Sequence, residues 1–519
     1  MSKQTSRLVA LIAVSILGLM ALTAKQSARV LTPQRATVAS STTRNAAIIA
    51  ATTEVLKETS EIRELPILRP VKSGAQSRTE IERMLIKNLN EQISAAEMHA
   101  TEVSFRKFGL SPGDFQYRPF IIKLLTEQVA GYYDPKGREF HLADWLELEG
   151  QKPVMAHELT HALQDQHFNL RRFEKWPHGD SDAELAVHTL IEGDATLAMT
   201  LYMAKNPLVA LAFSRSLTTG IATEQFNQAP RAMRESLIFP YMQGMEWATQ
   251  LYRRGGWTMV SNAFTRLPLS SEQIIHPEKY FNYERPIKIA LPDVTNLLNA
   301  NNSAVSTQQS APSNQQSAVS SQQSVVSSQQ PIKTAAATSA SGLRRIPRRG
   351  STAGRPLPTA HRSLPTAQIP QPTAAWHRLD SDVNGEWAYY LILDQFLNAP
   401  AESKRAAAGW AGDRYAIYEG PNDEVFLAQV AAWDTENDAR EFFDAYVKRT
   451  ELRYPGAKRL DSTTQKLETQ SPKPETGNFY SWQTSEGGVI VELRGQRVVI
   501  LEGIPAGAES ETLLKSLRQ

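Results

Sequence analysis

The spacing of hydrophobic positions changes from helical to alternating along this chain of 519 residues. Residues 78–108, 115–125, 153–168 and 182–204 predict helices, the first with its apolar residues on one stripe until a Gly and a Pro end it. The run VAGYYDPKGREFHLAD, just before the third helix, predicts a strand, a tight turn and a strand. Residues 78–294 are therefore expected to form an α-rich domain.

Strand-like runs dominate the end of the chain. RYAIY, VFLAQVAAW, FYSWQ, VIVEL and RVVILEG flank a helical stretch over residues 436–452, and two Gly-containing hairpin signals join the last three runs. Residues 376–519 are expected to form a small antiparallel α+β domain without a catalytic cluster of its own. The chain as a whole is expected to belong to the α+β class.

Low-complexity sequence separates these regions over residues 295–375. It begins with a repeat of Ser, Gln, Val and Ala and continues with a stretch rich in Pro and Arg. Neither can build a hydrophobic core, so a disordered linker is expected, with a binding role for the arginines between positions 344 and 349 as the alternative. Residues 25–77, rich in Thr, Ser and Ala, are expected to be a tether or a short pro-segment.

The N-terminus carries an export feature. Lys3 and Arg7 precede an uncharged apolar run over residues 8–24. Cleavage after Ala24 would leave Leu22 at the upstream recognition position, and the run approaches the ~20 residues that span a bilayer. Residues 1–24 are therefore expected to be a signal peptide or a membrane anchor, with membrane contact through residues 8–24 if the segment is retained. The protein is expected in the periplasm, the cell envelope or outside the cell.

Composition limits the chemistry that this chain can carry. Its 56 basic and 54 acidic residues leave a net charge of +2, so no global field favours nucleic acid as a partner. The chain has no cysteine, so any metal site must use nitrogen and oxygen ligands.

The sequence AHELTHALQDQHF places His157, Glu158 and His161 on the third predicted helix. Positions i and i+4 lie about 40° apart around a helix axis, so both imidazoles can reach one ion. Glu158 lies beside that face, where a carboxylate can act as a general base, and zinc suits imidazole and carboxylate ligands. The alternative is a helix that holds these residues by chance, but the apolar neighbours Val154 and Leu163 indicate a buried helix.

Three residues are candidates for the third metal ligand. His167 has the spacing of the longer HExxHxxGxxH pattern, but Gln164 stands where that pattern has the Gly that turns the chain. Glu192 lies on the next predicted helix, and Gly193 after it permits close approach of two helices. His188, one turn before Glu192, is a candidate to support the ligands or to contact substrate.

HELTH followed by LIEGDA resembles the gluzincin metallopeptidases, the group that includes thermolysin and the aminopeptidase-N-like enzymes. The resemblance implies a zincin-like fold, one catalytic Zn²⁺ bound by His157, His161 and Glu192, and Glu158 as general base. More narrowly, the run from GYYDP through EGDA to HPEKY resembles exported bacterial proteins of uncharacterised type.

Weaker candidates surround this motif. Thermolysin-like enzymes carry an aspartate one turn after the ligand glutamate, where this chain has Thr196, and Asp194 is present at a different angle. Tyr132 or Tyr133 could line a peptide held by the hairpin, with packing as the alternative. His276 in HPEKY could stabilise an oxyanion, with turn-capping or packing as the alternative.

Together these features predict an exported zinc peptidase whose partner is a peptide or protein substrate. The alternative is a non-catalytic, metal-stabilised binding or scaffold protein of the cell envelope. Glu158 favours the enzyme, because a purely structural metal site needs no general base.

Overall fold

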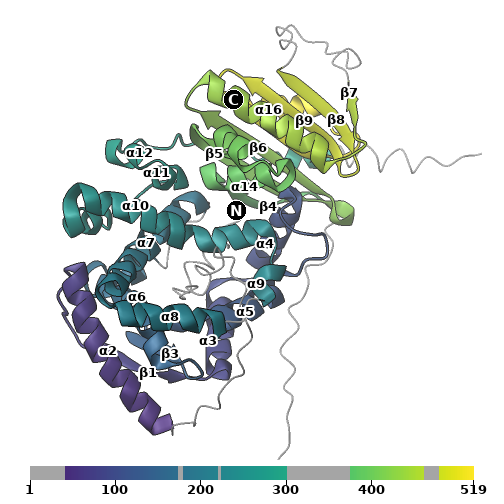
Figure 1. Cartoon of the computed structure of the whole chain (residues 1–519). Coiled ribbons are helices and arrows are strands. Elements are labelled where there is room, and N and C mark those ends of the chain that lie inside the picture. The colour runs from purple at the N-terminus through teal and green to yellow at the C-terminus, as the bar shows by residue number, and fades with distance from the viewer. Residues whose placement is uncertain (1–40, 174–178, 220–223, 301–374, 461–477, 519) are drawn as a thin grey trace, which may run out of the picture. The chain divides into compact units, whose positions relative to one another are not determined.

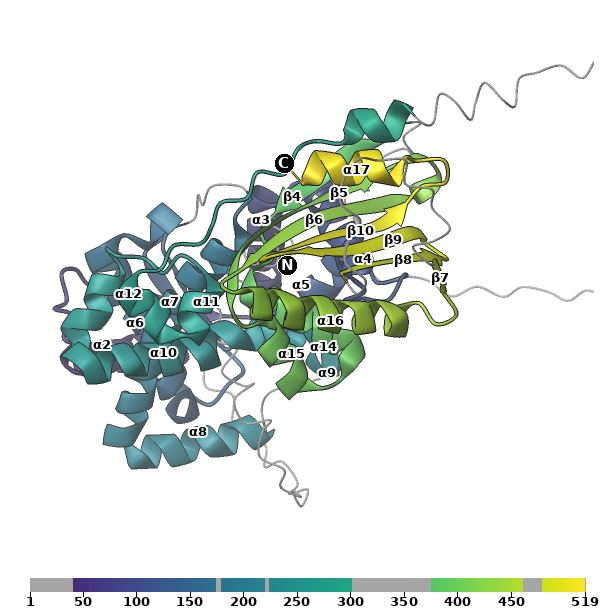
Figure 2. The ribbon, with the colours of Figure 1, turned by 90° about the horizontal axis from the view of Figure 1, so that it is seen from above.

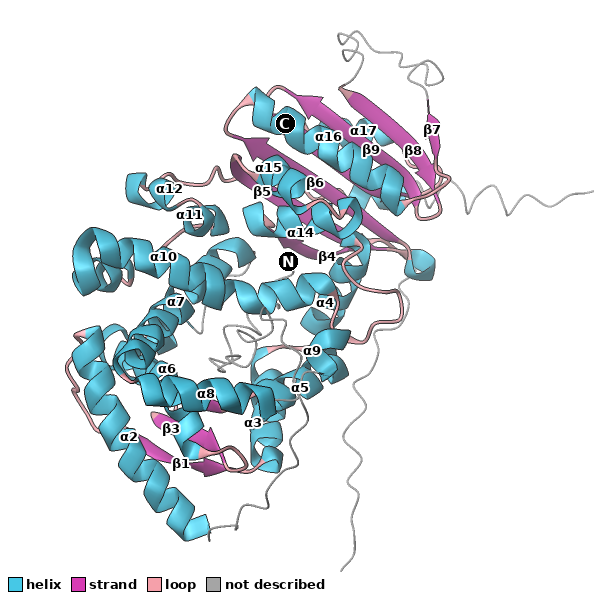
Figure 3. Cartoon of the chain, in the orientation of Figure 1, coloured by secondary structure: helices cyan, strands magenta, loops and turns pink. Residues whose placement is uncertain are grey.

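The computed structural model describes residues 41–173, 179–219, 224–300, 375–460 and 478–518, and it has a mixed α+β fold. Helices dominate the first three ranges, whereas the last two contain a large sheet together with helices (Figures 1 and 3). The predicted export segment and most of the predicted linker lie outside the described residues. Within the described part, no helix is long and apolar enough to cross a membrane.

The helical region contains the helices that the hydrophobic spacing predicts, with one break. The predicted helix over residues 78–108 is two helices, because Ser94 and Glu97 form a capping box that starts a second one. The main helices of this region are α2 (Ser41–Arg63), α3 (Arg78–Gln92), α4 (Ala95–Phe108), α5 (Tyr117–Gln128), α6 (Leu148–Phe168), α7 (Ser181–Lys205), α8 (Pro207–Thr219) and α10 (Arg231–Ala263).

The predicted hairpin is present as β2 (Gly131–Asp134) and β3 (Glu139–Ala143). A third strand, β1 (Lys72–Gln76), pairs in parallel with β3, so the sheet order is β1-β3-β2 and β2 is a terminal strand. Because β2 pairs with β3 on one side only, its other side is left toward α6.

The segment before β1 differs from the expected tether. Residues 41–63 form α2, whose Ile48 and Val55 are buried in one cluster with Leu159 and Leu163 of α6. The sequence did not reveal this helix, because its many Thr, Ser and Glu residues dilute the apolar stripe. α2 is therefore part of the packing around the motif helix.

The C-terminal region is the predicted antiparallel α+β unit. Its seven-stranded sheet has the order β4-β5-β6-β10-β9-β8-β7, and all neighbouring strands in it are antiparallel. Helices α14 and α16 lie on one face and α17 on the other (Figure 2). The elements are β4 (His377–Asp382), α14 (Gly385–Leu397), α15 (Pro400–Ala407), β5 (Trp410–Glu419), β6 (Val425–Trp433), α16 (Glu436–Arg453), β7 (Lys458–Leu460), β8 (Phe479–Thr484), β9 (Gly487–Arg494), β10 (Arg497–Ile504) and α17 (Ser510–Leu517).

Described residues from both regions belong to one compact unit and share one hydrophobic cluster. Leu190 of α7 and Trp247 of α10 lie in the same cluster as Tyr389 of α14 and Phe442 of α16. At the start of α7, the Ser181 hydroxyl and backbone N–H donate to Asp382 of β4. The predicted division into two domains stays a prediction, but these two regions are packed directly against each other.

Candidate metal centre

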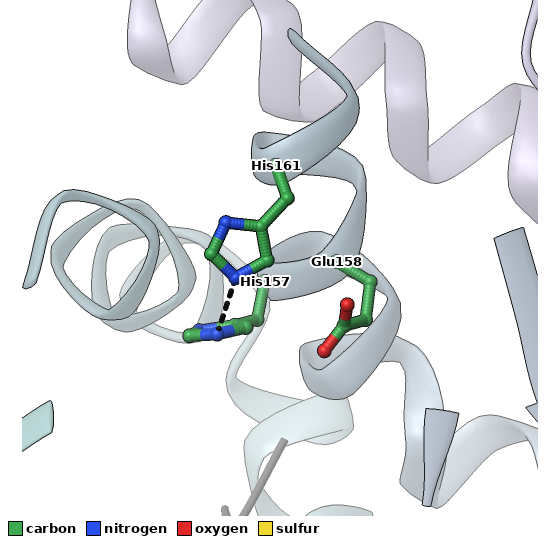
Figure 4. A group of neighbouring side chains, drawn as sticks. All are labelled: His157, Glu158 and His161. Carbon is green, nitrogen blue, oxygen red and sulfur yellow. Dashed lines mark hydrogen bonds between the residues drawn. The ribbon is translucent and has the colours of Figure 1, made fainter. Parts of the chain in front are cut away.

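Helix α6 positions the two motif histidines one turn apart. Their rings lie 4.7 Å apart at an interplanar angle of 87°, and the two Nε2 atoms are 3.1 Å apart (Figure 4). Both side chains are completely buried, as are the neighbouring Leu159 and Leu163. The helix begins before Pro153, at Leu148, and it ends where Asn169 adopts a left-handed conformation.

Helix α7 brings Glu192 to these imidazoles. Glu192 Oε2 lies 3.0 Å from His157 Nε2 and 3.5 Å from His161 Nε2, and the Glu192 side chain is fully buried. A tetrahedral zinc ion with bonds of about 2.0 Å spaces its ligand atoms by about 3.3 Å. The triangle of two nitrogens and one oxygen therefore has the size and the donor set that zinc needs.

Unpaired buried atoms at the same place fit a bound metal. Glu192 Oε1 and His188 Nε2, which lie 3.9 Å apart beside the triangle, have no hydrogen-bond partner among the described residues. Buried polar atoms without partners are costly, and two imidazole Nε2 atoms at contact distance cannot both donate to each other. A cation inside the triangle would resolve this arrangement, so the residues present fit zinc.

Glu192 and the two histidines are strongly coupled electrostatically. Burial opposes ionisation of Glu192, but the nearby His161 and His157 outweigh it and hold its pKa well below the usual range. Burial likewise disfavours protonated His161, but the Glu192 carboxylate raises its pKa to about 9, whereas burial lowers the pKa of His157. The site therefore holds a carboxylate ready to compensate a positive charge.

Glu158 lies beside the triangle and is held by a different partner. One potential ligand atom from each of His157, Glu158 and His161 lies within 4.8 Å of the others. The backbone N–H of Tyr133 in β2 donates to Glu158 Oε2 at 2.8 Å. Since Glu192 Oε2 contacts both Nε2 atoms directly, Glu192 is the better third ligand, and Glu158 is left for another role.

Gln164 is a member of the site that sequence reasoning treated only as an obstacle to the longer motif. Its Oε1 lies 2.8 Å from His161 Nδ1, and its Nε2 donates to the Ile191 carbonyl and to Asp194 Oδ2. Arg63 of α2 pairs in turn with Asp194. The position of Gln164, one turn after His161, was the signal available for finding it, whereas no sequence pattern pointed to Arg63.

The structure places two of the weaker candidates close to the centre. His188 Nε2 is 3.9 Å from Glu192 Oε1, and burial lowers the pKa of His188 to about 4. The Tyr133 hydroxyl donates to Asp165 Oδ2 at 3.0 Å, so this tyrosine contributes its backbone rather than its ring to the region of Glu158.

Two other candidates lie elsewhere. α6 continues through His167, whose Nε2 lies 2.7 Å from the Pro66 carbonyl. His276 Nε2 is 2.9 Å from Glu386 Oε1 of α14. Neither histidine has a contact with His157, His161 or Glu192, and each instead has a local partner that explains its place.

Gly193 permits a close helix contact, but with α10 rather than with the motif helix. A Cβ at Gly193 would lie 2.3 Å from the carbonyl carbon and oxygen of Gly244. The two glycines thus let α7 and α10 touch through their backbones next to Glu192.

Comparison with known proteins gives one match. Residues 372–513 match a family described as a domain of unknown function, DUF8575. No curated protein and no solved structure matches the chain. The described residues of this match belong to the C-terminal sheet region, whereas the candidate metal centre lies on α6 and α7, so the match assigns no chemistry to the site.

Proposed function

We propose that this protein is an exported, zinc-dependent peptidase of zincin-like fold that hydrolyses peptide bonds. The observation that carries the proposal is the convergence of His157 Nε2, His161 Nε2 and Glu192 Oε2 within 3.5 Å of one another, with a second buried carboxylate beside them. When bound there, zinc would supply a Lewis acid that polarises the scissile carbonyl and activates water.

Glu158 is the general base in this proposal. The Tyr133 N–H holds one carboxylate oxygen of Glu158 in place, and this carboxylate is proposed to take the proton of the attacking water. Glu158 then returns this proton to the leaving amine, so one carboxylate serves both halves of the reaction. The fixed bond to a strand keeps the carboxylate from turning toward the metal ligands.

β2 is proposed to align the substrate. It is a terminal strand of its sheet, and its Tyr133 N–H already points to the catalytic carboxylate. An extended peptide added along this side would run past Glu158 and would be held by main-chain bonds that require no particular side chain.

Complete burial of the centre favours a second candidate function. His157, Glu158, His161 and Glu192 all have 0% exposure, whereas a catalytic metal site must admit substrate. In the alternative, the metal stabilises a non-catalytic envelope protein. A bound peptidase substrate would instead require movement of an element that covers the centre.

The decisive experiment compares Glu158→Gln with His157→Ala in the purified protein. Glu158→Gln keeps the shape and the hydrogen bond from Tyr133, so it should retain one zinc per chain but lose cleavage of casein or of a peptide library by at least about 100-fold. His157→Ala should lose both zinc and activity. Zinc is measured by elemental analysis, with His167→Ala as the control because His167 lies outside the centre.

Each outcome separates the candidates. Cleavage by Glu158→Gln at the wild-type rate would exclude Glu158 as the base. Zinc in the wild-type protein without chelator-sensitive cleavage of any peptide would favour the structural role. Retention of zinc by Glu192→Ala, together with its loss from His167→Ala, would reassign the third ligand.

A further inference from the structure

A fully buried chain of polar contacts runs from the N-terminal helix α2 to the metal centre. Arg63, the last residue of α2, donates from Nε to Asp194 Oδ1 at 2.5 Å and from a second nitrogen to Oδ2 at 3.2 Å. Asp194 Oδ2 accepts from Gln164 Nε2 at 2.9 Å, and Gln164 Oε1 meets His161 Nδ1 at 2.8 Å. All four side chains have 0% exposure.

The acceptors around Gln164 fix the orientation of its amide. Gln164 Nε2 faces the Ile191 carbonyl and Asp194 Oδ2, which are both acceptors. The amide nitrogen must therefore point to them, and Oε1 must point to His161. An amide oxygen only accepts, so His161 Nδ1 carries a hydrogen, and in the neutral ring Nε2 holds the lone pair that faces His157 and Glu192. A histidine held in this tautomer is preorganised to bind a metal through Nε2.

Asp194 can play this part only while Arg63 is present. Arg63 is held over the Trp257 ring at 4.4 Å, and its guanidinium also donates to the Ser261 hydroxyl at 3.1 Å. Without the guanidinium, Asp194 would be a buried carboxylate without a counter-charge, which is strongly destabilising. One of the two acceptors that orient Gln164 therefore depends on a residue of α2.

We propose that Gln164, Asp194 and Arg63 are positioning residues that hold His161 as an Nε2 metal ligand, and that α2 is consequently an integral part of the centre rather than a removable pro-segment. This inference rests on the proposed function for its metal, but it concerns different residues. It explains how the site does without an aspartate at Thr196: the carboxylate at Asp194 acts through the Gln164 amide.

The first test replaces Gln164 by Met, which has a similar volume but no amide. The zinc dissociation constant, measured by competition with a chelator, should rise about 10–100-fold. Gln166→Met is the matched control, because Gln166 is on the same helix and binds the backbone of Leu68 and Arg69 instead of His161. Its zinc affinity should stay within about twofold of wild type.

A second readout separates positioning from general stability. Thermal unfolding of the zinc-free proteins shows how much each variant destabilises the fold itself. Loss of zinc affinity in Gln164→Met beyond that of a Gln166→Met protein of similar zinc-free stability supports positioning. Wild-type zinc affinity in Gln164→Met would overturn it. If His157→Ala also keeps zinc, the proposed centre itself is wrong. That result differs from the one expected if only the positioning by Gln164, Asp194 and Arg63 fails, in which case His157→Ala still loses zinc.

The third test addresses α2 through Arg63. Arg63→Met should weaken zinc binding by about 10-fold or more, because it leaves Asp194 unpaired. The double variant Arg63→Met, Asp194→Asn removes the charge and keeps an amide oxygen that can accept from Gln164, so it should recover most of the zinc affinity. Unchanged zinc affinity in Arg63→Met, or no recovery in the double variant, would show that α2 does not act on the centre.

Discussion

The residues of the candidate metal centre make contacts that differ in how far they reach along the chain. His157 and His161 are neighbours on one helix, so their shared face follows from helix geometry. Glu192 comes from the next helix; Gln164 in place of the turn glycine counted against His167, and the family resemblance implied Glu192 as the ligand. Arg63 lies 131 positions from Asp194, and no local pattern in the sequence encodes that pairing. Sequence reasoning therefore reached the candidate ligands and Asp194, but not the contacts of Gln164 and Arg63 that are proposed to orient His161.

A single added methyl group at Gly193 should disturb this centre. A Cβ there would lie 2.3 Å from backbone atoms of Gly244, well inside contact distance. Backbone atoms cannot relieve this clash by changing rotamer, so the two helices would have to move apart. Alanine gains about 1 kcal/mol of helix propensity over glycine, but overpacking costs typically about 1–3 kcal/mol, and this severe clash lies at the upper end or beyond it. We expect Gly193→Ala to lower the free energy of unfolding by about 2 kcal/mol in urea titrations.

The same substitution should also weaken zinc binding, because a shift of α7 moves the adjacent Glu192. The control is Gly113→Ala, since no atom lies within 4 Å of a Cβ at that position. A Gly193→Ala protein as stable as Gly113→Ala, and with the same zinc affinity, would show that the contact between α7 and α10 tolerates separation.

At the scale of elements, the runs of apolar residues predicted the central strands of the C-terminal sheet well, because β5, β6, β9 and β10 bury residues in the cluster of α14 and α16 and in the cluster of α17. The helical region was predicted less completely. The capping box of Ser94 and Glu97 determines the break between α3 and α4. The apolar stripe continues across this break, so the spacing of apolar residues alone predicted one helix. α2 was missed for another reason, since its place is set by packing on α6.

One ionic network joins the end of α4 to α16 and β10, and its pH dependence can be predicted. Glu502 of β10 is paired with Arg449 and Arg453 of α16, and these arginines donate to the carbonyls of Phe108 and Lys107. Burial alone would raise the pKa of Glu502, but the arginines outweigh it and lower the pKa to about 2. The lowered pKa means that ionised Glu502 stabilises the fold above the unfolded pKa and that this contribution is lost as pH falls toward 2.

The variant Glu502→Gln removes the titrating group with little change of shape. It should be less stable than wild type at pH 7, and the difference in free energy of unfolding should shrink by about 2 kcal/mol by pH 3, where the wild-type carboxylate begins to be protonated. Urea titrations at both pH values measure this difference. A gap that is constant with pH, or that widens at pH 3, would contradict the assignment of Glu502 as a stabilising carboxylate.

At the scale of the whole molecule, the sequence did not predict the interface between the helical region and the C-terminal sheet. A composition change marks a linker, but it does not show whether the regions on either side pack together. Here they share a hydrophobic cluster that includes residues from α7, α10, α14 and α16. The interface also contains the buried hydrogen bonds from Ser181 to Asp382 and the partly buried ion pair of Arg231 with Asp394.

Cutting the chain between the two regions should therefore leave them associated. A specific protease site inserted within residues 305–370 would produce two fragments whose contact buries the apolar side chains of a shared cluster, so we expect the fragments to stay associated without denaturant. The fragments are expected to co-elute in size-exclusion chromatography and to unfold together. Asp382→Ala provides the comparison, because it leaves the Ser181 N–H without its buried acceptor and should promote separation. Independent elution of the cleaved wild-type fragments would show that the C-terminal sheet is a separate domain, as the sequence first indicated.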